Sequence, residues 1–173
     1  MMVHSVELLF DADTEAAIRR IWDDLADTGV RSQAGHKAPS NRPHVTLAVA
    51  ETMDTAVDDA LRPLLRQLPI TCTVGAPMLF GRRQFTLVRL IVPSVPLLSL
   101  QADIHDACLP HAPQGPLPHS QPGQWTPHVT LARRVPAEQL QSALTVQSVS
   151  RELSATGVGI RHWDGNAKRE YSI

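Results

Sequence analysis

The chain has 173 residues, of which 43% are hydrophobic and 19% charged, and its formal net charge is −1. This composition predicts one folded globular domain and excludes a broad basic surface that would coat nucleic acid. The sequence contains no run of about 18 apolar residues, so it predicts no membrane-spanning helix. The start, MMVHSVELLFDAD, has no basic segment followed by a long apolar one, so we expect a cytoplasmic protein with reduced Cys72 and Cys108.

The first predicted elements are a strand and an amphipathic helix. Residues 3–10 read as the strand, and Asp13 or Thr14 is the expected N-cap of the helix, which Gly29 ends. The apolar stripe of this helix consists of Ala17, Ile18, Ile21, Trp22 and Leu25.

A second strand, at 43–48, precedes a second helix. Its stripe consists of Val57, Ala60, Leu61, Leu64, Leu65 and Leu68. Pro63 lies inside this stripe, so we expect the helix either to kink there or to start late. Strand-like segments follow at 70–75 and 84–92.

The second half begins with a helix that Ser94 and Pro96 open. Its predicted buried face consists of Leu97, Leu100, Ile104 and Cys108. A strand at 127–132, a short helix from near Pro136 with Leu140 and Leu144, and two strands around Asp164-Gly165 complete the chain. This order of elements predicts an α+β fold with mainly antiparallel sheet.

Residues 110–127 stand apart because they contain six prolines and two glycines. A long loop of this kind inside a domain is usually disordered or functional. Since it runs directly into the strand at 127–132, we favour a mobile flap beside the site over a tolerated surface insertion.

The sequence PHVTLA occurs twice, at 43–48 and at 127–132, about half a chain apart. This repeat predicts duplicated halves, roughly 1–92 and 93–173, within one domain. Because side chains alternate along a strand, His44 shares a face with Thr46, and His128 shares one with Thr130. Two such strands side by side would bring two imidazoles and two hydroxyls to one cleft.

This set of side chains suits the cleavage of a phosphodiester. Histidine has an ordinary pKa near 6.5, so one imidazole can accept a proton while the other donates one. Threonine hydroxyls can donate to the phosphate oxygens where charge develops. Zinc is the rival use of paired histidines, but neither motif has further ligands at close spacing, so we expect no metal and no other cofactor.

The motifs RPHVTLA at 42–48 and TPHVTLAR at 126–133 resemble those of the two-histidine (2H) phosphoesterase superfamily, in particular its bacterial 2′–5′ RNA ligase-like, or RNA 2′,3′-cyclic phosphodiesterase, branch. The resemblance implies a bilobed fold with the cleft between pseudo-symmetric lobes, no metal, and hydrolysis of cyclic phosphates to 2′-phosphomonoesters. It also implies that His44 protonates the leaving 3′ oxygen, that His128 activates water, and that Thr46 and Thr130 hold the phosphate. The motif itself leaves open which histidine is the acid.

Four further residues are candidate substrate contacts. Arg133 follows the second motif, but alternation places it on the outward face unless the strand bulges, and a salt bridge is its alternative role. Arg42 has the parity of His44. Phe85 and Trp125 are candidates for stacking on a base, with core packing as the alternative. Five further histidines are expected to be mostly solvent-exposed and non-catalytic: His36, His105, His111, His119 and His162.

Three functions fit these residues. The first is a monomeric, metal-independent phosphodiesterase acting on an RNA terminal 2′,3′-cyclic phosphate or a small cyclic nucleotide. The second is a nucleotide- or RNA-binding module without turnover, and the third is 2′–5′ RNA ligation. Transfer RNA fragments, ADP-ribose cyclic phosphate and free cyclic nucleotides all remain open as natural substrates.

Overall fold

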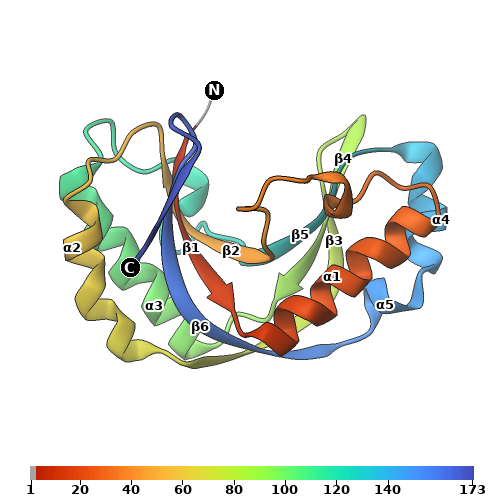
Figure 1. Cartoon of the computed structure of the whole chain (residues 1–173), viewed down its shortest axis with the longest axis horizontal. Helices are drawn as coiled ribbons and strands as arrows, with labels where there is room; N and C mark the ends of the chain where they lie inside the picture. The colour runs from red at the N-terminus through yellow and green to blue at the C-terminus, as the bar shows by residue number, and fades with distance from the viewer. Residues whose placement is uncertain (1–2) are drawn as a thin grey trace.

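A computed structural model describes residues 3–173, and its seven strands form one antiparallel sheet of order β1-β2-β5-β4-β3-β6-β7. The strands are β1 (His4–Phe10), β2 (His44–Ala50), β3 (Ile70–Phe80), β4 (Gln84–Ile91), β5 (His128–Pro136), β6 (Leu153–Asp164) and β7 (Arg169–Ser172). Because β1 also pairs with the long strand β6, the pairing of the first six strands closes on itself in a strongly curved sheet (Figure 1). The predicted α+β class with an antiparallel sheet is confirmed.

Two groups of helices flank this curved sheet (Figure 1). One group is α2 (Val57–Leu61) and α3 (Val95–Cys108), and the other is α1 (Ala12–Asp27), α4 (Leu140–Thr145) and α5 (Gln147–Ser150). The chain crosses between the groups, since α1 follows β1 but contacts β5, and α3 follows β4 but contacts β2. Each lobe is therefore built from both sequence halves, 1–92 and 93–173.

The ends of the two longest helices follow local capping chemistry. The N-cap of α1 is Asp11, whose side chain accepts a hydrogen bond from the Thr14 amide at 3.0 Å, so our expectation of Asp13 or Thr14 was wrong by two or three residues. Gly29 follows the helix with a φ of 83°, which glycine adopts without steric cost. Ser94 caps α3 as predicted, accepting from the Leu97 amide.

The second predicted helix changes its type at the proline. It is α-helical only over Val57–Leu61 and continues as a 3-10 helix, η2 (Arg62–Gln67). Pro63 has no amide hydrogen and cannot make the α-helical bond, which accounts for the change. Four more 3-10 turns connect the elements, namely η1 (Gln33–Gly35), η3 (Leu109–His111), η4 (Pro118–Ser120) and η5 (Ala137–Gln139).

The core confirms the predicted alternation in both motif strands. Val45 and Leu47 of β2 are fully buried, as is Leu131 of β5, and Val129 is 1% exposed. The predicted face of α3 is buried as well, and both cysteines are buried and reduced. Since apolar residues occupy the side of each motif strand that packs against the helices, the intervening polar residues are left on the opposite side.

Two histidines that we expected to be mostly exposed are buried instead. His162 is 1% exposed because its Nδ1 lies 2.9 Å from an Asp58 oxygen and its Nε2 lies 3.0 Å from Nδ1 of His4. His105, on α3, is 9% exposed. His162 is therefore buried because its partners come from distant elements, which the local sequence does not reveal, whereas the partner of His105 is the neighbouring Asp106 at 3.4 Å.

The proline-rich loop 110–127 packs against the sheet rather than standing away from it. The Leu117 amide donates to the Val49 carbonyl at 2.7 Å, and the Ser120 carbonyl accepts from the buried Gln101 side chain at 2.7 Å. Pro116 also forms an isolated bridge with Ala50. The loop lies beside the predicted site, as expected, but these contacts make it a wall of the cleft. Within residues 3–173, no helix is long and apolar enough to cross a membrane.

Candidate active site

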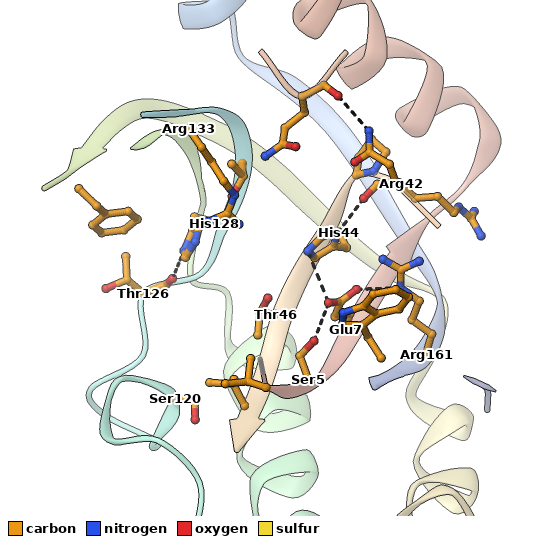
Figure 2. A pocket seen from close by; sticks show the side chains of 18 of the residues that line it. Ser5, Glu7, Arg42, His44, Thr46, Ser120, Thr126, His128, Arg133 and Arg161 are labelled. Atoms are coloured by element: carbon orange, nitrogen blue, oxygen red, sulfur yellow. Dashed lines mark hydrogen bonds and ion pairs between the residues drawn. The ribbon is translucent and has the colours of Figure 1, made fainter. Parts of the chain in front are cut away.

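Both PHVTLA motifs open into one cleft of about 800 Å³. His44 and Thr46 enter it from β2, and His128 and Thr130 enter it from β5 (Figure 2). The two strands are antiparallel and pair only at Val45 and Val129, so they diverge on either side of this point. The divergence leaves room between the two motif strands for a small ligand.

The two imidazoles are held in the same way. Nδ1 of His44 lies 2.7 Å from the Arg42 carbonyl oxygen, and Nδ1 of His128 lies 2.7 Å from the Thr126 carbonyl oxygen (Figure 2). A carbonyl oxygen can only accept, so both rings carry a hydrogen on Nδ1. Nε2 is therefore the nitrogen that each ring can use to exchange a proton with a ligand in the cleft.

A β-bulge occurs at the equivalent leucine of each motif strand. Against β1, the register of β2 skips Leu47, and against β4 the register of β5 skips Leu131. Each bulge reverses the alternation that follows it, so Arg133 lines the cleft instead of lying on the predicted outward face. The alternative that we left open, a bulged strand, is the one that the structure adopts.

Two tryptophans complete the hydrogen bonding of the motif strands. The Trp125 indole donates to the Thr46 carbonyl at 2.9 Å, and the Trp22 indole donates to the Thr130 carbonyl at 3.1 Å. Strand pairing does not reach these carbonyls because β2 and β5 diverge next to them. Each indole therefore replaces a missing ladder bond and braces one motif strand.

The surroundings of the two histidines differ in charge. Oε1 of Glu7, on β1, lies 3.6 Å from Nε2 of His44. Around His128, burial lowers the pKa of the imidazole below its ordinary value; the hydrogen bond to the Thr126 carbonyl acts in the opposite sense, and the nearby Arg133 and His44 lower it again. The cleft therefore favours a neutral His128 near neutral pH.

The remaining candidate contacts have different positions. Arg42 lines the cleft, but its guanidinium is bound to Glu15, since Nε and Nη2 donate to one carboxylate oxygen at 2.9 Å and 2.8 Å. Trp125 lines the cleft as expected, whereas Phe85 packs against the core and is not among the residues that line it. Phe80, at the end of β3, lies there instead, with its ring 5.0 Å from that of His128.

Several cleft residues were missed from the sequence. They are Ser5, Glu7, Trp22, Phe80, Arg161 and Trp163, together with His36 and His119, which we had set aside as non-catalytic. Ser5 and Glu7 did leave a signal, because they are polar residues at alternate positions of a strand that is apolar apart from them and His4, and such alternation marks one face of a strand as polar. Phe80 and Trp22 left none, since an aromatic residue in a hairpin or helix is ordinarily a packing residue.

A cleft between two α+β lobes, with a His-x-Thr strand from each side, is the arrangement that the resemblance to two-histidine phosphoesterases implied. The chain belongs to the 2′-5′ RNA ligase superfamily, whose sequence model matches residues 10–167. No curated protein matches the chain significantly.

Solved structures show the same fold at low sequence identity. TT0787 of Thermus thermophilus matches with a TM-score of 0.61 and 14% identity, over 99% of this chain and 95% of that one. Usb1 of Kluyveromyces marxianus with uridine monophosphate matches with a TM-score of 0.54 and 10% identity, over 98% and 96%. LigT of E. coli complexed with 3′-AMP matches with a TM-score of 0.51 and 15% identity, over 99% and 93%.

Proposed function

We propose that this protein hydrolyses the 2′,3′-cyclic phosphate of an RNA end or of a small nucleotide to a 2′-phosphate, without a metal ion. The observation that carries the proposal is the matched pair of imidazoles, each held through Nδ1 so that Nε2 is free for proton exchange in one cleft. A site that only bound a nucleotide would not need two oriented proton carriers.

The proposed reaction divides two proton transfers between the histidines. Neutral His128 takes a proton through Nε2 from a water molecule as its oxygen bonds to phosphorus. The bond from phosphorus to the 3′ oxygen breaks, and His44 donates its Nε2 proton to that oxygen. The product is a 2′-phosphate with a free 3′-hydroxyl, and exchange with solvent returns one proton to His44 and removes one from His128.

Other residues of the cleft would bind the phosphate and the nucleoside. Thr46 and Thr130 lie on the cleft face beside the two histidines, where their hydroxyls can donate to the non-bridging phosphate oxygens. Arg133 makes no hydrogen bond or ion pair within residues 3–173, so its charge is available to an anion at the cleft. Phe80 is 37% exposed and offers a ring for a base to stack on.

The related structures support a nucleotide as the ligand. Usb1 was solved with uridine monophosphate and LigT with 3′-AMP. These proteins share the fold with this chain at 10% and 15% identity, so they support a nucleotide as the class of ligand.

The decisive experiment offers the purified protein, in EDTA, the four nucleoside 2′,3′-cyclic monophosphates and a short RNA ending in a cyclic phosphate. We expect turnover to the 2′-phosphate that is lost in both His44→Ala and His128→Ala. His111→Ala is the matched control, since His111 lies outside the cleft beside Asp54, and it should retain full activity.

Two results would contradict the proposal. Binding without turnover in the wild-type protein would make the cleft a nucleotide-binding module, and full activity in either histidine variant would remove the acid–base pair. Thr46→Val and Thr130→Val test the phosphate contacts, and each should lower kcat by about 100-fold, the typical loss of one transition-state hydrogen-bond donor.

A further inference from the structure

We propose that Glu7 is a positioning residue that holds His44 in its protonated form and thereby makes it the acid of the pair. The inference rests on the proposed function, because the roles of acid and base have meaning only for the reaction described above. It adds a physical reason for the division of labour, which two identical motifs cannot supply by themselves.

The Glu7 carboxylate is fixed in place by its neighbours. It is 4% exposed, its Oε2 accepts from Nε of Arg161 at 2.7 Å, and its Oε1 accepts from the Ser5 hydroxyl at 2.7 Å. Arg161 is itself held by the Ser40 carbonyl at 2.9 Å and by Glu170 at 2.6 Å. Oε1 is therefore the oxygen that faces His44, at 3.6 Å from Nε2 (Figure 2).

The carboxylate is ionised in this setting. Burial acts to raise the pKa of Glu7, but the charges of His44 and Arg161 and the hydrogen bonds from Ser5 and Arg161 outweigh it, so this pKa lies below its ordinary value. A buried negative charge 3.6 Å from Nε2 favours a proton on that nitrogen. Because this distance is longer than a hydrogen bond, the Nε2–H stays available to the leaving oxygen. Glu7 is too enclosed to act as a substrate contact.

The second motif lacks this carboxylate. Glu7 pairs across the strands with Thr46, and the residue that pairs in the same way with Thr130 is Val88. Directly paired residues lie on the same face of a sheet, so an apolar side chain occupies beside the second motif the position that Glu7 occupies beside the first. Among residues 3–173, Glu7 is the one carboxylate that lines the cleft.

The other charges near His44 act against Glu7. Arg161 on β6 and Arg133 and His128 on β5 line the same cleft, and a positive charge on any of them disfavours a protonated His44. His36 and His119 also line the cleft and act in the same sense when protonated. Arg42, the neighbour in sequence, has its guanidinium neutralised by Glu15. An opposite charge within about 4–6 Å changes a titration by roughly one to three pH units, and because the Glu7–His44 contact of 3.6 Å is not a hydrogen bond we expect the removal of the Glu7 charge to act at the lower end, about one unit.

The test removes the charge of Glu7 and follows His44 in two ways. In Glu7→Gln, the alkaline limb of the kcat/KM profile should move to lower pH by about one unit, since His44 then loses its proton more easily. The acid limb, which reports the protonation of His128, should stay in place. NMR titration of the His44 imidazole in the free protein should show the same shift. Activity above the alkaline limb should fall about tenfold.

Two further variants separate this effect from damage to the fold. Glu170→Gln removes the second carboxylate that binds Arg161. Glu170 does not line the cleft with His44, so both limbs of the profile should stay unchanged. The double variant with Glu7→Gln and Arg161→Gln leaves no unpaired buried charge, since Glu170, the remaining partner of Arg161, has a side chain that is 44% exposed, so it keeps the test valid where the single variant does not fold. Its alkaline limb and NMR titration should shift in the same direction, because Oε1 of Glu7 faces Nε2 whereas Arg161 binds the other oxygen.

The outcomes distinguish this inference from the proposed function. If the wild-type protein shows no turnover but the His44 NMR titration shifts in Glu7→Gln, the contact is real and the proposed function is wrong. If turnover is present but the alkaline limb and the NMR titration match the wild type in both Glu7 variants, the positioning role of Glu7 is overturned.

Discussion

The two indole hydrogen bonds to the motif strands lead to a prediction about the whole cleft. Trp22→Phe and Trp125→Phe keep an aromatic ring at each position but remove the N–H that donates to the Thr130 or Thr46 carbonyl. Because β2 and β5 pair at one residue pair only, strand pairing cannot satisfy these carbonyls. Each substitution therefore leaves one orphaned acceptor next to the cleft.

The magnitude follows from burial at each site. A neutral hydrogen bond contributes about 0.5–1.5 kcal/mol, and a buried acceptor left without a partner costs about 1–3 kcal/mol. Trp22 is 2% exposed, so Trp22→Phe should lower the free energy of unfolding by about 2–3 kcal/mol. Trp125 is only partly buried, which lets water reach part of the gap, and Trp125→Phe should cost about 1–2 kcal/mol.

Urea unfolding of each variant measures these losses, and Trp163→Phe is the matched control. Trp163 lines the same cleft, but its indole makes no hydrogen bond within residues 3–173, so its substitution should change stability by less than about 0.5 kcal/mol. We also expect kcat/KM to fall about tenfold in Trp22→Phe and Trp125→Phe, since a displaced strand misplaces its histidine. If both lose no more stability than Trp163→Phe, the reasoning that the indoles brace the strands is refuted.

Two further predictions concern stability. Arg89 is fully buried and donates to four backbone carbonyls, those of Val74, Gly75, Ser148 and Arg151. Arg89→Met should therefore lower the free energy of unfolding in urea by at least about 3 kcal/mol. A loss below about 1 kcal/mol would contradict this role. Because the pKa of His128 is lowered in the folded protein, the unfolded chain binds a proton on this imidazole more readily. The free energy of unfolding should therefore fall as the pH drops below about 6.5, and in His128→Gln the fall between about pH 7.5 and 5.5 should be smaller.

The parts of the site that the sequence predicts are those encoded within a single strand. The repeated PHVTLA, read with the alternation of side chains, placed His44 and Thr46 on the face opposite Val45, and the structure brings them to the same cleft as His128 and Thr130. This succeeded because burial of one strand face depends on a period of two that the sequence shows directly.

The parts that escaped prediction depend on tertiary geometry. Arg133 was assigned to the wrong face because the bulge at Leu131 has no local marker such as glycine, and it arises where β5 twists away from β2. Phe80 was not among the candidates because sequence alone does not say how far a strand extends, and β3 continues to Phe80 rather than ending near residue 75. Glu7 is separated from His44 by a helix, so its proximity appears only once β1 and β2 are paired.

The two motif strands are built in the same way, so a difference between their histidines must come from the residues around them. Both motif strands hold their histidine through the carbonyl two residues earlier, bulge at the same leucine, and have an indole on the threonine carbonyl. We propose that these correspondences come from duplicated halves, 1–92 and 93–173, as the repeat predicts. Two identical imidazoles would favour the same protonation state, whereas phosphodiester hydrolysis needs one of each. A charged partner such as Glu7 on one side and an apolar one such as Val88 on the other would be a small change that separates them, so the proposed reaction would require the two proposed halves to differ in the strands that flank the motifs.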